Sequence, residues 1–186
     1  MADELGLKVI KEAMVVEHIP LVVAYADIIQ IGSRNMQHFP LLWAAGETDK
    51  PVMLKRGFMA TVTEWLFAAE HIASRGNERI ILCERGIRTF GTETRNTLDT
   101  NALALAKLES PFPVMGDPSH ATGRADLVIP ASRAAIAAGA DGLIIEVHPR
   151  PTEALSDGEQ SLSLTEFSRL VEESGKIAHA MGRSLR

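Results

Sequence analysis

The sequence lacks several features that would mark whole classes of protein. Its 186 residues include one cysteine, Cys83, so no intrachain disulfide can form, and a secreted fold held by disulfides is excluded. Lys and Arg number 19 against 24 Asp and Glu, and no basic run occurs, so we expect no nucleic-acid binding. The longest apolar stretch, residues 19–31, is interrupted by Asp27 and is too short to span a membrane.

The composition is that of an ordinary globular protein. Apolar residues make up 46% and charged residues 23%, which argues against disorder. The length suits one domain, and we expect residues 1–186 to form a single one. The N-terminal Met1-Ala2-Asp3-Glu4 carries no basic region followed by an apolar run, so we expect no signal peptide. We therefore expect a cytoplasmic location.

Short apolar runs alternate with amphipathic segments along the whole chain. Strands are predicted at residues 7–10, 27–31, 51–54, 79–83, 113–115 and 142–145. Helices are predicted at residues 61–74, with a capping box at its start, and at 96–108, 126–138 and 164 to about 181. Six units of strand and helix indicate an α/β fold in which helices cover a parallel sheet.

Two architectures fit such a pattern, a doubly wound sheet and a (β/α)8 barrel. Charged residues follow several strands at their C-terminal ends, which a barrel active site requires. A doubly wound sheet would concentrate them at one switch point, usually behind a glycine-rich turn, and the sequence has no GxGxxG. We therefore favour the barrel. A complete barrel needs about 250 residues, so the pattern predicts an incomplete barrel of about six βα units.

Three residues in the C-terminal half could bind a metal. His120 and Glu146 follow neighbouring predicted strands, and Asp157 lies in the loop beyond. One imidazole and two carboxylates favour Mn²⁺ or Fe²⁺ over a structural zinc. The same residue types also occur in solvated loops, and the residues alone leave both interpretations open.

A second set of residues is cationic. Arg34, Lys55 and Arg85 each stand at or just after the end of an apolar strand, and a glycine lies within two residues of each. Cations that converge on one end of a sheet suit the recognition of phosphate or carboxylate. Strand-end charges that merely face water are the alternative.

Six motifs in order give the sequence a specific resemblance. It resembles 3-deoxy-D-arabino-heptulosonate 7-phosphate (DAHP) synthase, in its compact type I branch, over essentially the whole chain. The motifs are Gln30-Ile31-Gly32-Ser33-Arg34-Asn35-Met36-Gln37, Leu54-Lys55-Arg56-Gly57, Cys83-Glu84-Arg85-Gly86-Ile87-Arg88-Thr89-Phe90, Thr94-Arg95-Asn96-Thr97-Leu98-Asp99, Asp117-Pro118-Ser119-His120-Ala121-Thr122-Gly123-Arg124, and Glu146-Val147-His148-Pro149 followed by Leu155-Ser156-Asp157-Gly158.

The resemblance implies a fold, a reaction and roles for individual residues. The family is a (β/α)8 barrel that condenses phosphoenolpyruvate with erythrose 4-phosphate, the first step of the shikimate pathway. Roles carried over by the matching motifs are metal ligation for His120, Glu146 and Asp157, phosphoenolpyruvate binding for Arg34, Lys55 and Arg85, and a carboxylate near the reacting carbon for Glu12, with Lys55 and Glu12 as the catalytic pair. The related octulosonate synthase, which uses arabinose 5-phosphate, ranks below this interpretation.

The resemblance also implies what the sequence does not contain. Family members carry two further βα units before the matching segment, and these supply a fourth metal ligand, a cysteine, and a Lys-Pro-Arg-Thr loop. We therefore expect a homo-oligomer or a complementing chain as partner, and little activity from the chain alone. A non-catalytic remnant that binds phosphoenolpyruvate or a partner subunit is the alternative.

Overall fold

A computed structural model describes residues 2–184, which form two compact units divided between Cys83 and Glu84. None of the helices within the described residues combines the length and hydrophobicity that crossing a membrane requires.

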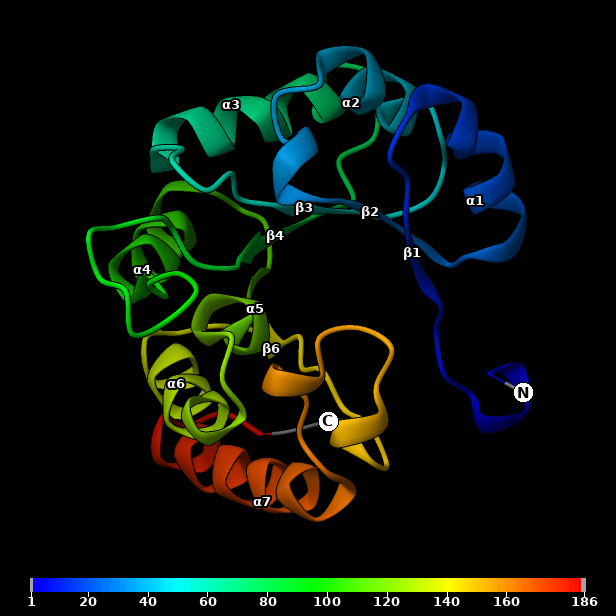
Figure 1. The fold of residues 1–186 in the computed structure, drawn as a ribbon. Helices are drawn as coiled ribbons and strands as arrows, with labels where there is room; N and C mark the ends of the chain where they lie inside the picture. The colour runs from blue at the N-terminus through cyan, green and yellow to red at the C-terminus, as the bar shows by residue number, and fades with distance from the viewer. Residues whose placement is uncertain (1, 185–186) are drawn as a thin grey trace. The chain divides into compact units, whose positions relative to one another are not determined.

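The first unit contains four parallel strands with helices along one side (Figure 1). The strands pair in chain order, with Ile10 opposite Ile28, Ile29 opposite Val52, and Val52 opposite Ile80. The elements are β1 (Ile10–Glu12), α1 (Ile19–Tyr25), β2 (Ile28–Ile31), α2 (Phe39–Gly46), β3 (Val52–Lys55), α3 (Val62–Ala73) and β4 (Ile80–Glu84).

Apolar side chains of the strands and of α3 make the core of the first unit. All four residues of β3 are buried, up to and including Lys55. Trp65 of α3 is fully buried, and its indole N–H donates to the carbonyl oxygen of Leu54 at 3.2 Å, so burial leaves no polar atom of this side chain unsatisfied. Cys83 of β4 is buried and forms no disulfide.

Within the described residues, the second unit contains the last two strands and the α-helices α4 to α7. Strand β5 (Val114–Gly116) pairs in parallel with the short β6 (Gly142–Leu143). The backbone N–H of Asp117 donates to the carbonyl of Glu84, at the end of β4, over 2.7 Å. The helices are α4 (Thr100–Glu109), α5 (Pro118–Thr122), α6 (Ala125–Ala137) and α7 (Leu164–Ala180).

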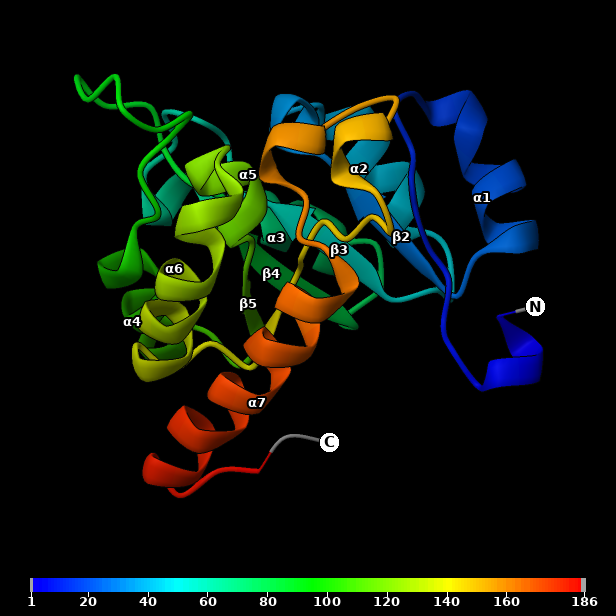
Figure 2. The ribbon, with the colours of Figure 1, turned by 60° about the horizontal axis from the view of Figure 1, so that its bottom comes forward.

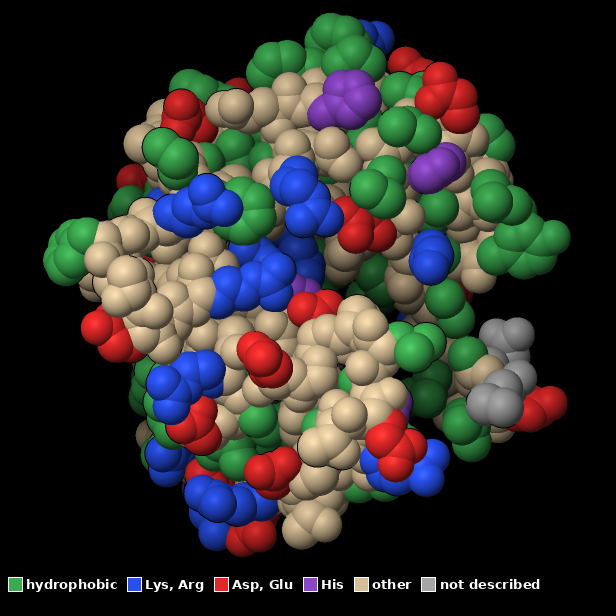
Figure 3. Space-filling model, viewed as in Figure 1, with side chains coloured by type: hydrophobic (Ala, Val, Ile, Leu, Met, Phe, Trp, Pro, Cys, Tyr) green, Lys and Arg blue, Asp and Glu red, His purple; other side chains and the backbone are tan. Residues whose placement is uncertain are grey.

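Helices α6 and α7 lie side by side (Figure 2). Val128 and Ile129 of α6 form a buried apolar cluster with Leu162 and with Leu170 of α7. The outward surfaces of the two helices carry charges of both signs (Figure 3), in ion pairs such as Arg133–Glu173 and Lys176–Glu172. Each helix therefore buries one stripe and leaves the opposite one to water.

The structure confirms most of the predicted elements and corrects several bounds. The predicted capping box of α3 is present, since the hydroxyl of Thr61 accepts from the N–H of Glu64 and the Glu64 carboxylate accepts from the N–H of Thr61. The predicted helix at 96–108 begins only at Thr100, because the side chain of Asp99 caps it. Strand β1 spans Ile10–Glu12 instead of residues 7–10, since regular pairing with β2 starts at Ile10.

Candidate metal centre and anion-binding residues

His120, Glu146 and Asp157 come together in the second unit. Each offers one ligand atom, and these three atoms lie within 4.8 Å of one another. The Nε2 atom of His120 lies 3.5 Å from Oε1 of Glu146. His120 and Glu146 are partly buried and Asp157 is exposed, so the group is reachable from solvent.

His120 is placed by the short helix α5. Asp117 caps this helix, and its carboxylate accepts the backbone N–H of His120 at 3.0 Å. Pro118 occupies the first turn, where a missing N–H costs nothing. Gly123 ends the helix at φ +67°, a left-handed conformation in which a side chain would also collide with Arg95. The helix is therefore only five residues long, with its histidine at the third position.

Glu146 lies just beyond β6, on backbone that is hydrogen-bonded on both sides. Its N–H donates to the hydroxyl of Ser119, which is fully buried in α5, at 3.0 Å. Its carbonyl accepts from the N–H of Leu162 at 2.9 Å. The main chain of this candidate ligand is thus fixed against the same helix that carries His120.

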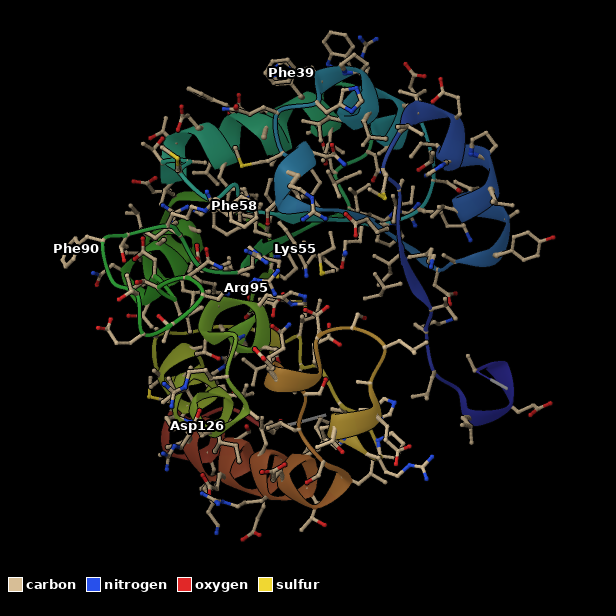
Figure 4. The ribbon with its side chains drawn as sticks, in the orientation of Figure 1. Phe39, Lys55, Phe58, Phe90, Arg95 and Asp126 are labelled. Atoms are coloured by element: carbon tan, nitrogen blue, oxygen red, sulfur yellow. The ribbon has the colours of Figure 1, made fainter. Side chains whose placement is uncertain are left out.

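Asp157 is held by a strained backbone and by an arginine. It is the one residue other than glycine with positive φ in the described part of the chain, at 54°. Arg95 Nη1 contacts its Oδ1 at 3.2 Å and donates to Gln160 Oε1 at 3.1 Å. The sequence alone predicts no role for Arg95, labelled in Figure 4, although this residue lies in one of the six motifs.

The donor set fits a divalent cation. The Nδ1 atom of His120 lies 2.8–2.9 Å from the carboxylate of Asp117, which leaves Nε2 facing Glu146. One imidazole nitrogen and two carboxylates offer the mixed N and O ligands that Mn²⁺ and Fe²⁺ accept. These three residues can hold a metal, and the arrangement does not distinguish among divalent ions.

The candidate residues of the first unit lie at the C-terminal ends of β1, β2 and β3. Lys55 is the last residue of β3 (Figure 4) and is only 6% exposed. Arg34 lies in a 3-10 turn, Ser33–Asn35, directly after β2, and is exposed. Because the strands are parallel, their C-terminal ends share one edge of the sheet.

Glu12 ends β1 and reaches across to β2. Its Oε2 accepts from the side-chain amide of Gln30 at 3.4 Å. Its Oε1 lies where a side chain on Gly32 would begin, 2.1 Å from an ideal Cβ position. Gly32 is therefore required for the close approach of the carboxylate to the β2 backbone.

Arg85 belongs to the second unit, one residue after β4, and is 5% exposed. The following Gly86 has φ +91°, and a Cβ there would approach Asn96 and the backbone of Ala121 to within 3.0 Å. Its N–H donates to the carboxylate of Glu84 at 2.7 Å. This turn can only be made by glycine, and it fixes the end of the strand from which Arg85 extends.

The fold and the ligand set together define a class: a βα-repeat protein of the (β/α)8-barrel family, with six βα units and a candidate divalent-metal centre at strand ends. More narrowly, the chain belongs to the DAHP synthetase I family, whose model matches residues 1–181. The fold class and family predicted from the sequence are thereby confirmed.

Known relatives resemble the chain over most of its length. It is 58% identical to phospho-2-dehydro-3-deoxyheptonate aldolase of Thermotoga maritima over 97% of this chain. A solved truncated form of 3-deoxy-D-arabino-heptulosonate 7-phosphate synthase from Thermotoga maritima covers all of this chain with a TM-score of 0.97 and 57% identity. A 2-dehydro-3-deoxyphosphooctonate aldolase of Syntrophotalea carbinolica is 34% identical over 92% of this chain and 65% of its own length.

The relatives are longer than this chain. It spans 54% of the length of the Thermotoga aldolase and 71% of the truncated solved chain.

Proposed function

We propose that the chain supplies the metal-binding and phosphoenolpyruvate-binding parts of a 3-deoxy-7-phosphoheptulonate synthase. The reaction condenses phosphoenolpyruvate, erythrose 4-phosphate and water to DAHP and phosphate. The observation that carries the proposal is the convergence of His120, Glu146 and Asp157 within 4.8 Å in a chain 58% identical to a heptulosonate aldolase. The lower identity to the octulosonate aldolase, 34%, favours the four-carbon sugar phosphate as the second substrate.

His120, Glu146 and Asp157 would hold Mn²⁺ or Fe²⁺. When bound, such an ion supplies Lewis-acid polarisation of a carbonyl oxygen. Neighbouring side chains orient two of these candidate ligands. The Asp117 carboxylate contacts Nδ1 of the His120 ring, and Arg95 contacts the Asp157 carboxylate.

Arg34, Lys55 and Arg85 would bind the phosphate and carboxylate of phosphoenolpyruvate. Lys55 and Arg85 are 6% and 5% exposed, and a cation that is held away from water interacts strongly with an anionic ligand. Arg34 is exposed, and water and salt screen its charge, so we expect it to contribute least of the three to phosphoenolpyruvate affinity.

Lys55 and Glu12 are the residues that we assign to the reacting end of the substrate. The enol C3 of phosphoenolpyruvate forms the new C–C bond with the aldehyde carbon, whose oxygen takes a proton and becomes a hydroxyl. Positive charge develops at C2, water adds there with loss of a proton, and the C2–O bond breaks to release phosphate. Lys55 would hold the anionic substrate in line, and the Glu12 carboxylate would lie near the reacting enol carbon.

The surface of the first unit supports a partner chain. Helix α1 reads Ile-Pro-Leu-Val-Val-Ala-Tyr and carries no charged residue, a pattern typical of a helix buried on all sides. Yet Leu21 is 63% and Tyr25 79% exposed, and hydrophobic side chains lie over α1 in Figure 3. A groove of about 570 Å³ runs between this helix and β1, and its lining includes Val9 and Met14. We propose that another chain, complementing or identical, covers this groove.

The test is DAHP formation from phosphoenolpyruvate and erythrose 4-phosphate with Mn²⁺. We expect little product from the chain alone. Product should appear when the part of the solved truncated Thermotoga chain that this chain does not cover is supplied as a separate polypeptide. The same mixture with His120→Ala should stay inactive.

Three outcomes would contradict the proposal. Phosphoenolpyruvate binding without turnover in the complemented mixture would support a non-catalytic binding protein instead. Faster turnover with arabinose 5-phosphate than with erythrose 4-phosphate would assign the octulosonate reaction. Full turnover by the chain alone, as a monomer, would remove the need for a partner.

A further inference from the structure

We infer that Asp117 is a positioning residue that sets the tautomer of His120 and thereby makes its Nε2 atom available to a metal. The inference rests on the proposed metal centre and assigns a role to a residue outside the ligand set. Asp117 is fully buried, and its carboxylate lies 2.8–2.9 Å from His120 Nδ1.

The direction of this hydrogen bond follows from the chemistry of the two groups. An ionised carboxylate can only accept, so when the Asp117 carboxylate is ionised and the ring is neutral, a hydrogen bond over this distance places the proton on Nδ1. The other nitrogen, Nε2, then bears the lone pair. It points toward Glu146, whose Oε1 lies 3.5 Å away. A ring with its proton on Nε2 would have no lone pair to offer on the side where the two carboxylates lie.

The backbone fixes Asp117 relative to the ring. The same carboxylate accepts the backbone N–H of His120 at 3.0 Å, so one side chain holds both the main chain and the ring of the histidine. The main-chain carbonyl of His120 accepts from the side-chain amide of Asn96 at 3.1 Å, and this hydrogen bond further restricts the backbone of His120. A histidine that is held in this way meets a metal without reorientation, and loss of such an outer partner typically costs about 10- to 100-fold in metal affinity.

The inference predicts a spectroscopic signature in the metal-free protein. Nitrogen-15 NMR of the neutral histidine rings, with the His120 signals assigned through His120→Gln, should show the proton on Nδ1. Finding it on Nε2 would overturn the inference without any substitution at Asp117. This readout does not depend on metal binding or on activity, so it separates the role of Asp117 from the proposed function.

Asp117→Asn provides the second readout. Asparagine caps a helix about as well as aspartate, and its amide can donate to Nδ1, so the ring proton should move toward Nε2. Mn²⁺ affinity, measured by electron paramagnetic resonance of the free ion, should fall about 10- to 100-fold. Asp99→Asn is the matched control, because Asp99 caps α4 in the same unit, and it should change neither property.

The possible outcomes separate the positioning role of Asp117 from the metal-binding function of His120. If the unsubstituted chain binds Mn²⁺ and Asp117→Asn leaves both the tautomer and the affinity unchanged, the positioning role is wrong and the metal centre stands. If the chain does not bind Mn²⁺ through His120 but the tautomer shifts in Asp117→Asn, the positioning of the ring is supported and the metal function fails. An equal loss of affinity in Asp99→Asn would mean that capping alone explains the effect, and would overturn the inference.

Discussion

The two units place their candidate functional groups in different ways. In the first, Glu12, Arg34 and Lys55 stand at or just after the ends of regular parallel strands, so their positions follow from strand register. In the second, His120 lies on a five-residue helix and Glu146 beyond a two-residue strand. Side chain to backbone hydrogen bonds, such as that from the Glu146 N–H to Ser119, replace the regular ladder there.

This difference in how the groups are held determines how far a substitution disturbs the backbone. In the first unit a functional side chain can be removed with its strand left intact, because the backbone pairs independently of it. In the second unit the supporting side chains also fix the backbone, so their loss moves the candidate ligands. Substitutions at single residues of each unit distinguish these two cases.

The largest effect is expected at the second unit's metal centre. His120→Ala removes the nitrogen ligand and should weaken Mn²⁺ binding by at least about 100-fold, more than the loss of an outer partner. Isothermal titration with Mn²⁺ measures this. His179→Ala, an exposed histidine on α7, is the control and should bind as the unsubstituted chain does. Equal binding by both variants would remove His120 from the ligand set.

The next effect is expected at the end of β3 in the first unit. Lys55→Met keeps an apolar stem in a buried strand but removes the ammonium, so phosphoenolpyruvate affinity should fall by about 1.5–3 kcal/mol, the typical worth of a hydrogen bond to a charged group. Calorimetric titration with phosphoenolpyruvate tests it. Lys50→Met, before the opposite end of the same strand, should leave the affinity unchanged. Unaltered affinity in Lys55→Met would exclude this residue from the site.

A smaller effect should follow from filling the space beside Glu12. Gly32→Ala places a methyl group where Oε1 of Glu12 lies, and the carboxylate must turn away. Turnover in the complemented assay should drop about 10- to 100-fold, which is the loss expected when a catalytic group such as the Glu12 carboxylate is displaced. Stability should change little, since a flexible side-chain end gives way.

Gly175→Ala is the control for Gly32→Ala. Gly175 lies inside α7, and an added Cβ there meets nothing within 4 Å. It should keep full turnover and raise the free energy of unfolding by about 0.5–1 kcal/mol. If Gly32→Ala keeps full turnover while Glu12→Gln is inactive, the carboxylate acts from a position other than the one beside Gly32.

The smallest effects are expected at the capping boxes, one in each unit. Thr61→Ala and Ser163→Ala should each lower the free energy of unfolding by about 0.5–2 kcal/mol. The backbone N–H and hydroxyl of Thr61 lower the pKa of Glu64 below its ordinary 4.5, and the hydroxyl and N–H of Ser163 do the same for Glu166. A pKa that is lowered by folding stabilises the folded state fully above that ordinary value, and this stabilisation is lost as pH falls through the folded pKa.

Urea denaturation between neutral and acidic pH checks these capping boxes. The unsubstituted chain should lose stability below about pH 4.5, and each alanine variant should lose less over the same range. The same pH dependence in the variants as in the unsubstituted chain would show that the two carboxylates titrate independently of their caps.

The sequence predicts the regular parts of the molecule well. Apolar runs locate all six strands to within a few residues, and Thr61 and Glu64 predict the start of α3 because capping is a local interaction. The sequence does not delimit helices α1 and α2, since each is short and apolar, with a proline as its second residue, and so gives no amphipathic signal.

The site is predictable in identity and less so in arrangement. Strand-end and loop positions point to Lys55 and to the set of His120, Glu146 and Asp157, and the family resemblance adds the role of Glu12. The contacts that arrange these residues join positions distant in sequence, such as Arg95 with Asp157 and Ser119 with Glu146. A local sequence pattern cannot predict such pairs. Asp117 is the exception, because it lies only three residues before the ring that it holds.

Anomalous X-ray scattering from crystals of the chain soaked in Mn²⁺ locates the bound ion directly. We expect one strong peak about 2.0–2.3 Å from His120 Nε2 and from one oxygen each of Glu146 and Asp157. We also expect the peak to be lost in His120→Ala crystals soaked in the same way. A peak that is elsewhere, or no peak at a Mn²⁺ concentration that saturates binding in solution, would contradict the assignment of these three residues as metal ligands.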